Sequence, residues 1–255
     1  MIVGDKGPPP PPTITAMTSD APPAAGLQAH GSLPVAPRLP VRRLRLVAEI
    51  GLFYLCLPLL YAHLIQTYRI SLIVLMQPLL LALLAYLLWS RDFSLQREFS
   101  RGVSGRVVAG IIGLFVLVAG AISAWVSINE PGGFLSFPLY NTRMWLLVMV
   151  FYPLLSVLPQ ELAFRSFFFH RYGPLFGDRL WLLALVNGAL FGFAHIIYGG
   201  PVSIILSGAL GVLLAWRYAR TRSLRAIWLE HALYGQMIFT VGLGRYFFTG
   251  VSTLQ

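Results

Sequence analysis

The stretch Pro159-Gln160-Glu161-Leu162-Ala163-Phe164-Arg165 sets a carboxylate and a guanidinium four residues apart within a long apolar run. Side chains at this spacing lie on one face of a helix and can form an ion pair. Ionisable side chains are rare in membrane-spanning helices because burying them in hydrocarbon is costly, and those that occur are mostly functional. The stretch therefore predicts a membrane-embedded helix with a functional site around Glu161 and Arg165.

The composition of the whole chain also indicates a membrane location. Of its 255 residues, 57% are hydrophobic and only 11% are charged, which excludes an ordinary soluble domain. The net charge of +10 comes from arginines that flank apolar runs, without the interleaved aromatic residues of a basic nucleic-acid surface. We therefore expect the lipid bilayer as a partner, and no nucleic acid.

Seven apolar runs are long enough to cross a bilayer, which takes about 17 to 25 helical residues. They predict an all-α fold, a multi-pass transmembrane helical bundle. Small residues at helical spacing, Gly188 with Gly192 and Ser207 with Gly211, predict close contacts between helices. The predicted spans are residues 46–65, 70–89, 107–128, 144–172, 180–198, 202–219 and 226–243.

The chain divides into four predicted regions. Residues 1–45 are rich in proline, lack apolar periodicity and end in a basic flank, which is typical of a disordered tail. N-terminal transmembrane helices occupy residues 46–130, and a core that carries the polar motifs occupies residues 140–245. Residues 246–255 form a C-terminal tail.

The arginines are concentrated in alternate loops, beginning with the segment before the first span. Because basic residues are retained on the cytoplasmic side, this asymmetry places the N-terminus in the cytoplasm. With seven spans, the C-terminus would lie on the opposite side. We expect an integral multi-pass protein of a bacterial inner membrane.

Two histidines share the predicted core with Glu161. His195 follows Asn187 at two intervals of four residues, so both side chains lie on one helical face. His231 lies in the last predicted span. One intramembrane histidine is most often a hydrogen-bonded packing residue, but a single polar cavity would satisfy all three ionisable side chains at once.

One carboxylate and two imidazoles support two chemistries. The carboxylate can act as general base on a water molecule, with one histidine orienting the water and the other stabilising an oxyanion. Alternatively, Glu161, His195 and His231 can bind Zn²⁺, which would lower the pKa of its bound water. No His-Glu-x-x-His sequence occurs to favour zinc. Both possibilities, no cofactor or Zn²⁺, remain open at this point.

Three patterns can now be written for the chain: Gln160-Glu161-x-x-x-Arg165, Phe191-x-x-x-His195 and His231-x-x-x-Gly235. They resemble the three motifs of the CAAX protease and bacteriocin-processing (CPBP, or Abi) family of intramembrane proteases. That family carries Glu-Glu-x-x-x-Arg, Phe-x-x-x-His and His-x-x-x-Asn on successive core helices. The resemblance implies an intramembrane endopeptidase that hydrolyses a peptide bond near the membrane surface with an activated water. Its substrate would be a membrane protein or a lipidated peptide.

The resemblance implies that Glu161, His195 and His231 are the catalytic residues. We interpret Glu161 as the general base or its electrostatic partner, and His195 as the residue that orients the water. His231 would stabilise the oxyanion together with the hydroxyl of Tyr234. The expected supporting residues are Gln160, Arg165, Asn187 and Tyr234.

The chain departs from the family pattern at two motif positions. Gln160 stands where the family has the glutamate that activates water, and an amide cannot act as a general base. Gly235 stands where the family has an asparagine that donates to the oxyanion. The alternative function is therefore a catalytically silent membrane protein that binds a peptide or a lipid tail, in an immunity or scaffold role.

Overall fold

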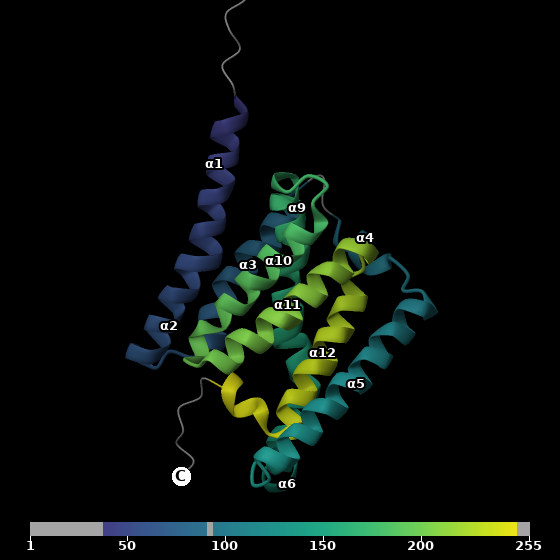
Figure 1. The fold of residues 1–255 in the computed structure, drawn as a ribbon. Coiled ribbons are helices and arrows are strands. Elements are labelled where there is room, and N and C mark those ends of the chain that lie inside the picture. Colours follow the sequence, from purple (N-terminus) through teal and green to yellow (C-terminus); the bar gives the residue numbers. More distant parts are fainter. Residues whose placement is uncertain (1–37, 91–93, 249–255) are drawn as a thin grey trace, which may run out of the picture. The chain divides into compact units, whose positions relative to one another are not determined.

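The computed structural model describes residues 38–90 and 94–248, and every regular element in these ranges is a helix (Figure 1). The predicted all-α fold is thereby confirmed. Contacts between Cα atoms group residues 39–255 into one compact unit, which is described here by itself. Most of the predicted tail 1–45, and residues 249–255 of the predicted C-terminal tail, lie outside the described residues.

All seven predicted spans are helical. The first joins α1 (Arg38–Gly51), η1 (Leu52–Cys56) and α2 (Leu57–Tyr68), and it is followed by α3 (Leu72–Trp89) and α5 (Gly105–Asn129). The fourth joins α7 (Thr142–Tyr152), η2 (Pro153–Val157), α8 (Leu158–Glu161), η3 (Leu162–Phe167), α9 (Phe168–Tyr172) and η4 (Gly173–Leu175). The last three are α10 (Leu180–Ala194) with η5 (His195–Tyr198), α11 (Pro201–Thr221) and α12 (Leu224–Val241). Short connecting helices are α4 (Leu95–Ser100), α6 (Ser136–Tyr140) and η6 (Leu243–Phe247).

Five of these segments are long and apolar enough to cross a membrane, so the chain is an integral multi-pass membrane protein. Val74–Trp89 is a shorter apolar helix. The helix α12 is not among the five, and it carries Arg225, Glu230, His231 and Gln236. Seven crossings and the orientation in the membrane stay predictions. The five segments are Val41–Tyr68, Gly105–Asn129, Thr142–Leu175, Leu180–Tyr198 and Pro201–Thr221.

The fourth segment changes its helical hydrogen bonding twice. Two π-helical turns, η2 and η3, flank α8, which ends at Glu161. Two buried side chains donate hydrogen bonds into η3. Tyr54 Oη lies 2.8 Å from the carbonyl oxygen of Ala163, and Asn187 Nδ2 lies 2.7 Å from that of Phe164. A π turn rotates the residues that follow it relative to an α-helix, and such turns are frequent at functional sites.

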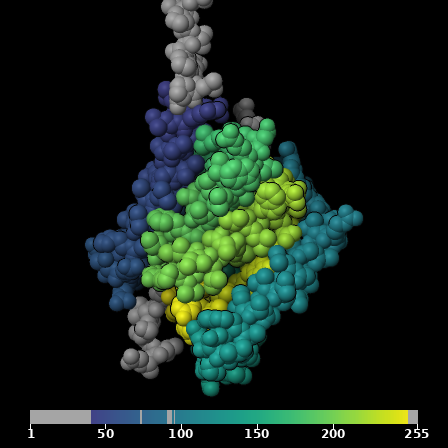
Figure 2. Space-filling view, viewed as in Figure 1, coloured from purple at the N-terminus to yellow at the C-terminus, as the bar shows by residue number. Residues whose placement is uncertain are grey.

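The helices α10 and α11 lie side by side with their backbones in close contact (Figures 1 and 2), as the small residues predicted. A Cβ atom added at Gly192 would lie 2.7 Å from the carbonyl oxygen of Ile204 and 2.8 Å from Cα of Gly208. At Gly188 it would lie 2.4 Å from Cγ2 of Val212. This contact sets the distance between the end of α10, where His195 follows, and the middle of α11.

Replacement of Gly192 by Leu is therefore expected to destabilise the protein by at least about 1–3 kcal/mol, because α10 and α11 must separate to admit the side chain. The measurement is the thermal unfolding temperature of the detergent-solubilised protein. Gly113→Leu in α5 is the matched control, since a Cβ atom at Gly113 meets nothing within 4 Å. Equal unfolding temperatures for the two variants would show that this packing is wrong.

Candidate active site

Glu161 forms the buried centre of the site. Its side chain is 0% exposed. Oε1 lies 3.3 Å from Nη1 of Arg165, which is the ion pair expected from the spacing, and 2.6 Å from Nδ1 of His231. Because a carboxylate only accepts hydrogen bonds, the imidazole hydrogen must lie on Nδ1. Glu161 therefore selects one tautomer of His231, and Arg165 compensates the negative charge of Glu161.

Arg165 links three helical segments. Its guanidinium, also 0% exposed, donates through Nη2 to the carbonyl oxygen of Gly211 at 3.2 Å. It lies over the ring of Phe191, 4.5 Å from the ring centre. A buried charge is tolerated when it is paired and hydrogen-bonded. Arg165 is paired with Glu161 and donates one hydrogen bond, while its Nε and Nη1 have no hydrogen-bond partner among the described residues. The pair with Glu161 thus belongs to the packing of α10 and α11 as well as to the site.

Phe191, the first residue of the second motif, packs against both His195 and His231. The ring centre of Phe191 lies 4.8 Å from that of His195 and 5.5 Å from that of His231. Nδ1 of His195 lies 2.7 Å from the carbonyl oxygen of Phe191, and since a carbonyl only accepts, this nitrogen carries the hydrogen. In the neutral form, Nε2 of each histidine is left with a lone pair.

Both histidines line a cavity of about 310 Å³ whose walls are largely apolar side chains of α5, α11 and α12. The sequence motifs therefore converge, as the resemblance implied, although Glu161 is not part of the lining and lies behind His231. The remaining polar residues of the wall are Tyr152, Ser156, Gln160, Tyr198, Ser207 and Tyr234.

Gln160, not Glu161, is the motif residue of α8 that faces the cavity. Its Nε2 donates to Oγ of Ser156 at 2.9 Å. Its buried Oε1 has no hydrogen-bond partner among the described residues. The side chain at the position of the family's first glutamate thus lines the cavity with a buried, unpaired amide oxygen, and Glu161 would have to leave Arg165 and His231 to replace it.

The supporting residues differ in their placement. Asn187 is fully buried and hydrogen-bonds to the carbonyl oxygen of Phe164, so it supports η3 and does not reach the cavity. Tyr234 does line the cavity. Its ring packs edge to face against Phe115, 5.6 Å between centres, and its Oη has no partner within residues 38–90 and 94–248.

The alternative of a zinc ion at Glu161, His195 and His231 does not fit this arrangement. In the described part of the chain, no three His, Cys, Asp or Glu side chains are grouped closely enough to hold a metal ion. Oε1 of Glu161 is already engaged by Arg165 and His231, and its Oε2, unpaired within the described residues, is buried in a residue that does not line the cavity. In a zinc site, Glu161 and His231 would each coordinate the ion directly, whereas here Glu161 accepts a hydrogen bond from Nδ1 of His231.

Glu230, next to His231 in the chain, belongs to a separate ion pair. Its carboxylate is 0% exposed and forms two hydrogen bonds with Arg217, one of them 2.8 Å from Nη2 to Oε1. The pair joins α11 to α12 at the level of the site. It explains the glutamate of this helix without a catalytic role.

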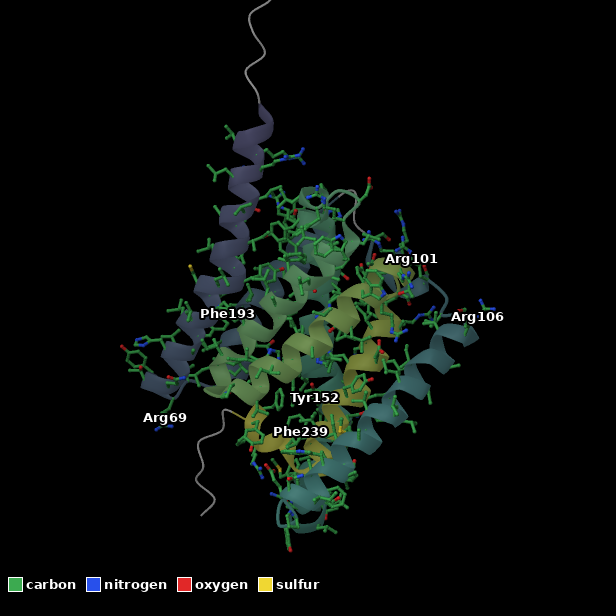
Figure 3. The ribbon with its side chains drawn as sticks, viewed as in Figure 1. Arg69, Arg101, Arg106, Tyr152, Phe193 and Phe239 are labelled. Carbon is green, nitrogen blue, oxygen red and sulfur yellow. The ribbon has the colours of Figure 1, made fainter. Side chains whose placement is uncertain are left out.

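Sequence reasoning missed Tyr152, the last residue of α7, which lines the cavity and lies against Gly235 of α12. Its ring lies 6.5 Å from that of His231 and 5.3 Å from that of Phe239, beside which it is seen in Figure 3. The available signal was Gly235. A glycine at a motif position where the family has a side chain leaves room for another residue.

Comparison with known proteins agrees with the three motifs. Residues 142–237 match the family model described as type II CAAX prenyl endopeptidase Rce1-like. No curated protein and no solved structure matches the chain. The matched range contains the ion pair, both histidines, the cavity-facing glutamine and Tyr152. Residues 142–237 are therefore similar to a CPBP-type protease domain, and this similarity supports a function of the intramembrane-protease kind.

Proposed function

We propose that this protein is an intramembrane endopeptidase in which His231, held by Glu161, activates the attacking water. The observation that carries the proposal is the 2.6 Å hydrogen bond between a fully buried carboxylate and Nδ1 of an imidazole whose ring borders the cavity. This is the arrangement in which a carboxylate fixes the tautomer of a histidine base and stabilises the imidazolium that forms.

In the proposed reaction, Nε2 of His231 accepts a proton from water while the water oxygen bonds to the carbonyl carbon of the scissile peptide. His231 then returns the proton to the leaving amine as the C–N bond breaks. Glu161 is a positioning residue in this scheme, because it acts through His231. This changes the expectation drawn from the sequence, in which Glu161 itself was a candidate base.

His195 and Gln160 supply acceptors for orienting the water. Nε2 of His195 has a lone pair, since Nδ1 donates to the backbone, and Oε1 of Gln160 lacks a partner among the described residues. An amide oxygen cannot remove a proton at neutral pH, but it can accept a hydrogen bond from the attacking water. Gln160 is therefore compatible with hydrolysis when His231 is the base.

The substrate we propose is a membrane-embedded or lipidated peptide. The matched family model is described as a CAAX prenyl endopeptidase, and the cavity walls are largely apolar. The alternative, a silent protein that binds such a peptide without cleaving it, is favoured by Gln160 and Gly235 alone.

The test is cleavage by the purified protein in liposomes. Two probes are used, a farnesylated peptide ending in a CAAX sequence and an unprenylated transmembrane peptide, both in heavy-oxygen water. We expect a cleaved product with one heavy oxygen in its new carboxylate. If the protein binds either probe but cleaves neither, the protease proposal is contradicted and the silent protein is supported.

A further inference from the structure

We infer that the hydroxyl of Tyr152 is the oxyanion donor of this site, in the volume left open by Gly235. The inference rests on the proposed protease function. It assigns a catalytic role to a residue outside the three motifs, from the preceding helix α7.

The shapes of Tyr152 and Gly235 are complementary. A Cβ atom added at Gly235 would lie 2.3 Å from Oη, 2.4 Å from Cε1 and 2.5 Å from Cζ of Tyr152. The hydroxyl end of the phenol therefore occupies the volume in which any side chain at position 235 would begin. Gly235 follows His231 by four residues, so this volume lies on the same face of α12 as the imidazole. A hydrogen-bond donor is thus retained where the motif has lost one.

Tyr152 is held in this place from both sides. Nε2 of Gln236 donates to the carbonyl oxygen of Met149 at 2.7 Å, and Nε1 of Trp228 donates to that of Pro153 at 2.6 Å. These two bonds fasten α7 and the start of η2 to α12, three residues before and one residue after Tyr152. Donors that are fixed before reaction need little reorganisation in the transition state, which is what an oxyanion site requires.

The π-helical turn η2 then carries the chain to the other cavity-facing residues. Tyr152, Ser156 and Gln160 follow one another at intervals of four and all line the cavity. Tyr152 therefore shares one wall with the amide oxygen of Gln160, while His231 lies on the neighbouring helix. A carbonyl placed between this wall and His231 would have its oxygen near the phenol and its carbon accessible to the activated water.

Tyr234, the donor expected from the sequence, has the same chemistry in a different place. It packs in a cluster with Val126, Met237 and Val241, and its ring contacts Phe115 of α5. On an ideal helix, the side chain at position 234 points about 60° away from that of His231, and a side chain at position 235 would point about 40° away. Tyr234 is therefore the competing donor that the test must distinguish from Tyr152.

The first experiment compares Tyr152→Phe with Tyr234→Phe in the liposome cleavage assay. Loss of an oxyanion donor costs about 10²- to 10³-fold in kcat, so we expect that decrease for Tyr152→Phe with little change in KM. Tyr140→Phe, at an exposed tyrosine outside the cavity lining, is the control and should leave cleavage unchanged. A decrease that is larger for Tyr234→Phe than for Tyr152→Phe would assign the donor to Tyr234 and overturn the inference. If the wild type is active and Tyr152→Phe has the same kcat, this inference alone is overturned. If the wild type is inactive, the proposed function is overturned and this role with it.

The second experiment exchanges the donor between the two positions. Gly235→Asn alone should lower the unfolding temperature and abolish cleavage, because the new side chain meets the phenol. Adding Tyr152→Ala should restore both the unfolding temperature and at least a tenth of the cleavage rate. If Gly235→Asn folds and cleaves like the wild type while Tyr152 is intact, the two residues do not compete for one volume and the inference is wrong.

Discussion

Replacement of Glu161 by Gln is expected to slow peptide cleavage by about 10³-fold or more, although it changes the shape of the side chain very little. The amide can present either its NH₂ or its oxygen to Nδ1 of His231, so the tautomer is no longer fixed. The negative charge that would stabilise the imidazolium is also lost. The measurement is kcat on whichever of the two probes the wild type cleaves.

The same substitution removes the counter-ion of Arg165, which is 0% exposed, and breaking a buried pair costs about 3–5 kcal/mol. Loss of activity through unfolding must therefore be separated from loss of the base. Glu161→Gln combined with Arg165→Met removes both charges and should recover much of the unfolding temperature without recovering cleavage. A double variant as active as the wild type would refute the role of Glu161.

Replacement of Gln160 by Glu is expected to raise the cleavage rate by about 10²-fold. A carboxylate at this position would face the cavity beside the hydroxyl of Ser156 and could act as a general base, a contribution of about 10²- to 10⁴-fold in enzymes. We expect an increase at the lower end of this range because His231 already supplies a base in the proposed mechanism. The assay is again kcat in liposomes.

Gln160→Met is the matched control, because it keeps the length of the side chain and adds no base. It should be no more active than the wild type. A Gln160→Glu variant that cleaves no faster than Gln160→Met would mean that water does not react beside α8. Activity that appears only with Glu at position 160 would instead identify the natural protein as the silent form.

The fold was predictable because it depends on the length of apolar runs. Each predicted span corresponds to a helical segment, and the glycines of α10 predicted the close contact with α11. The ion pair of Glu161 and Arg165 followed from their spacing on a helix. These features are local, so a single sequence contains the information that specifies them.

The direction in which each residue of α8 faces was not predictable. Adjacent helical residues differ by about 100° in direction, and the π-helical turns on both sides of α8 shift this angle further. Whether Gln160 or Glu161 faces the cavity therefore depends on the tertiary structure. Tyr152 was missed for a related reason, since its position depends on a contact between α7 and α12 that no local pattern encodes.

The spacing of Glu161 and Arg165 also bears on the order in which the protein is made. Their ion pair forms within one helical turn, whereas Gly211 and His231, the other partners of the two side chains, are synthesised later. During synthesis the segment can therefore enter the bilayer with its two charges already paired. The histidine arrives last, and the carboxylate that will hold it is in place before the rest of the active site exists.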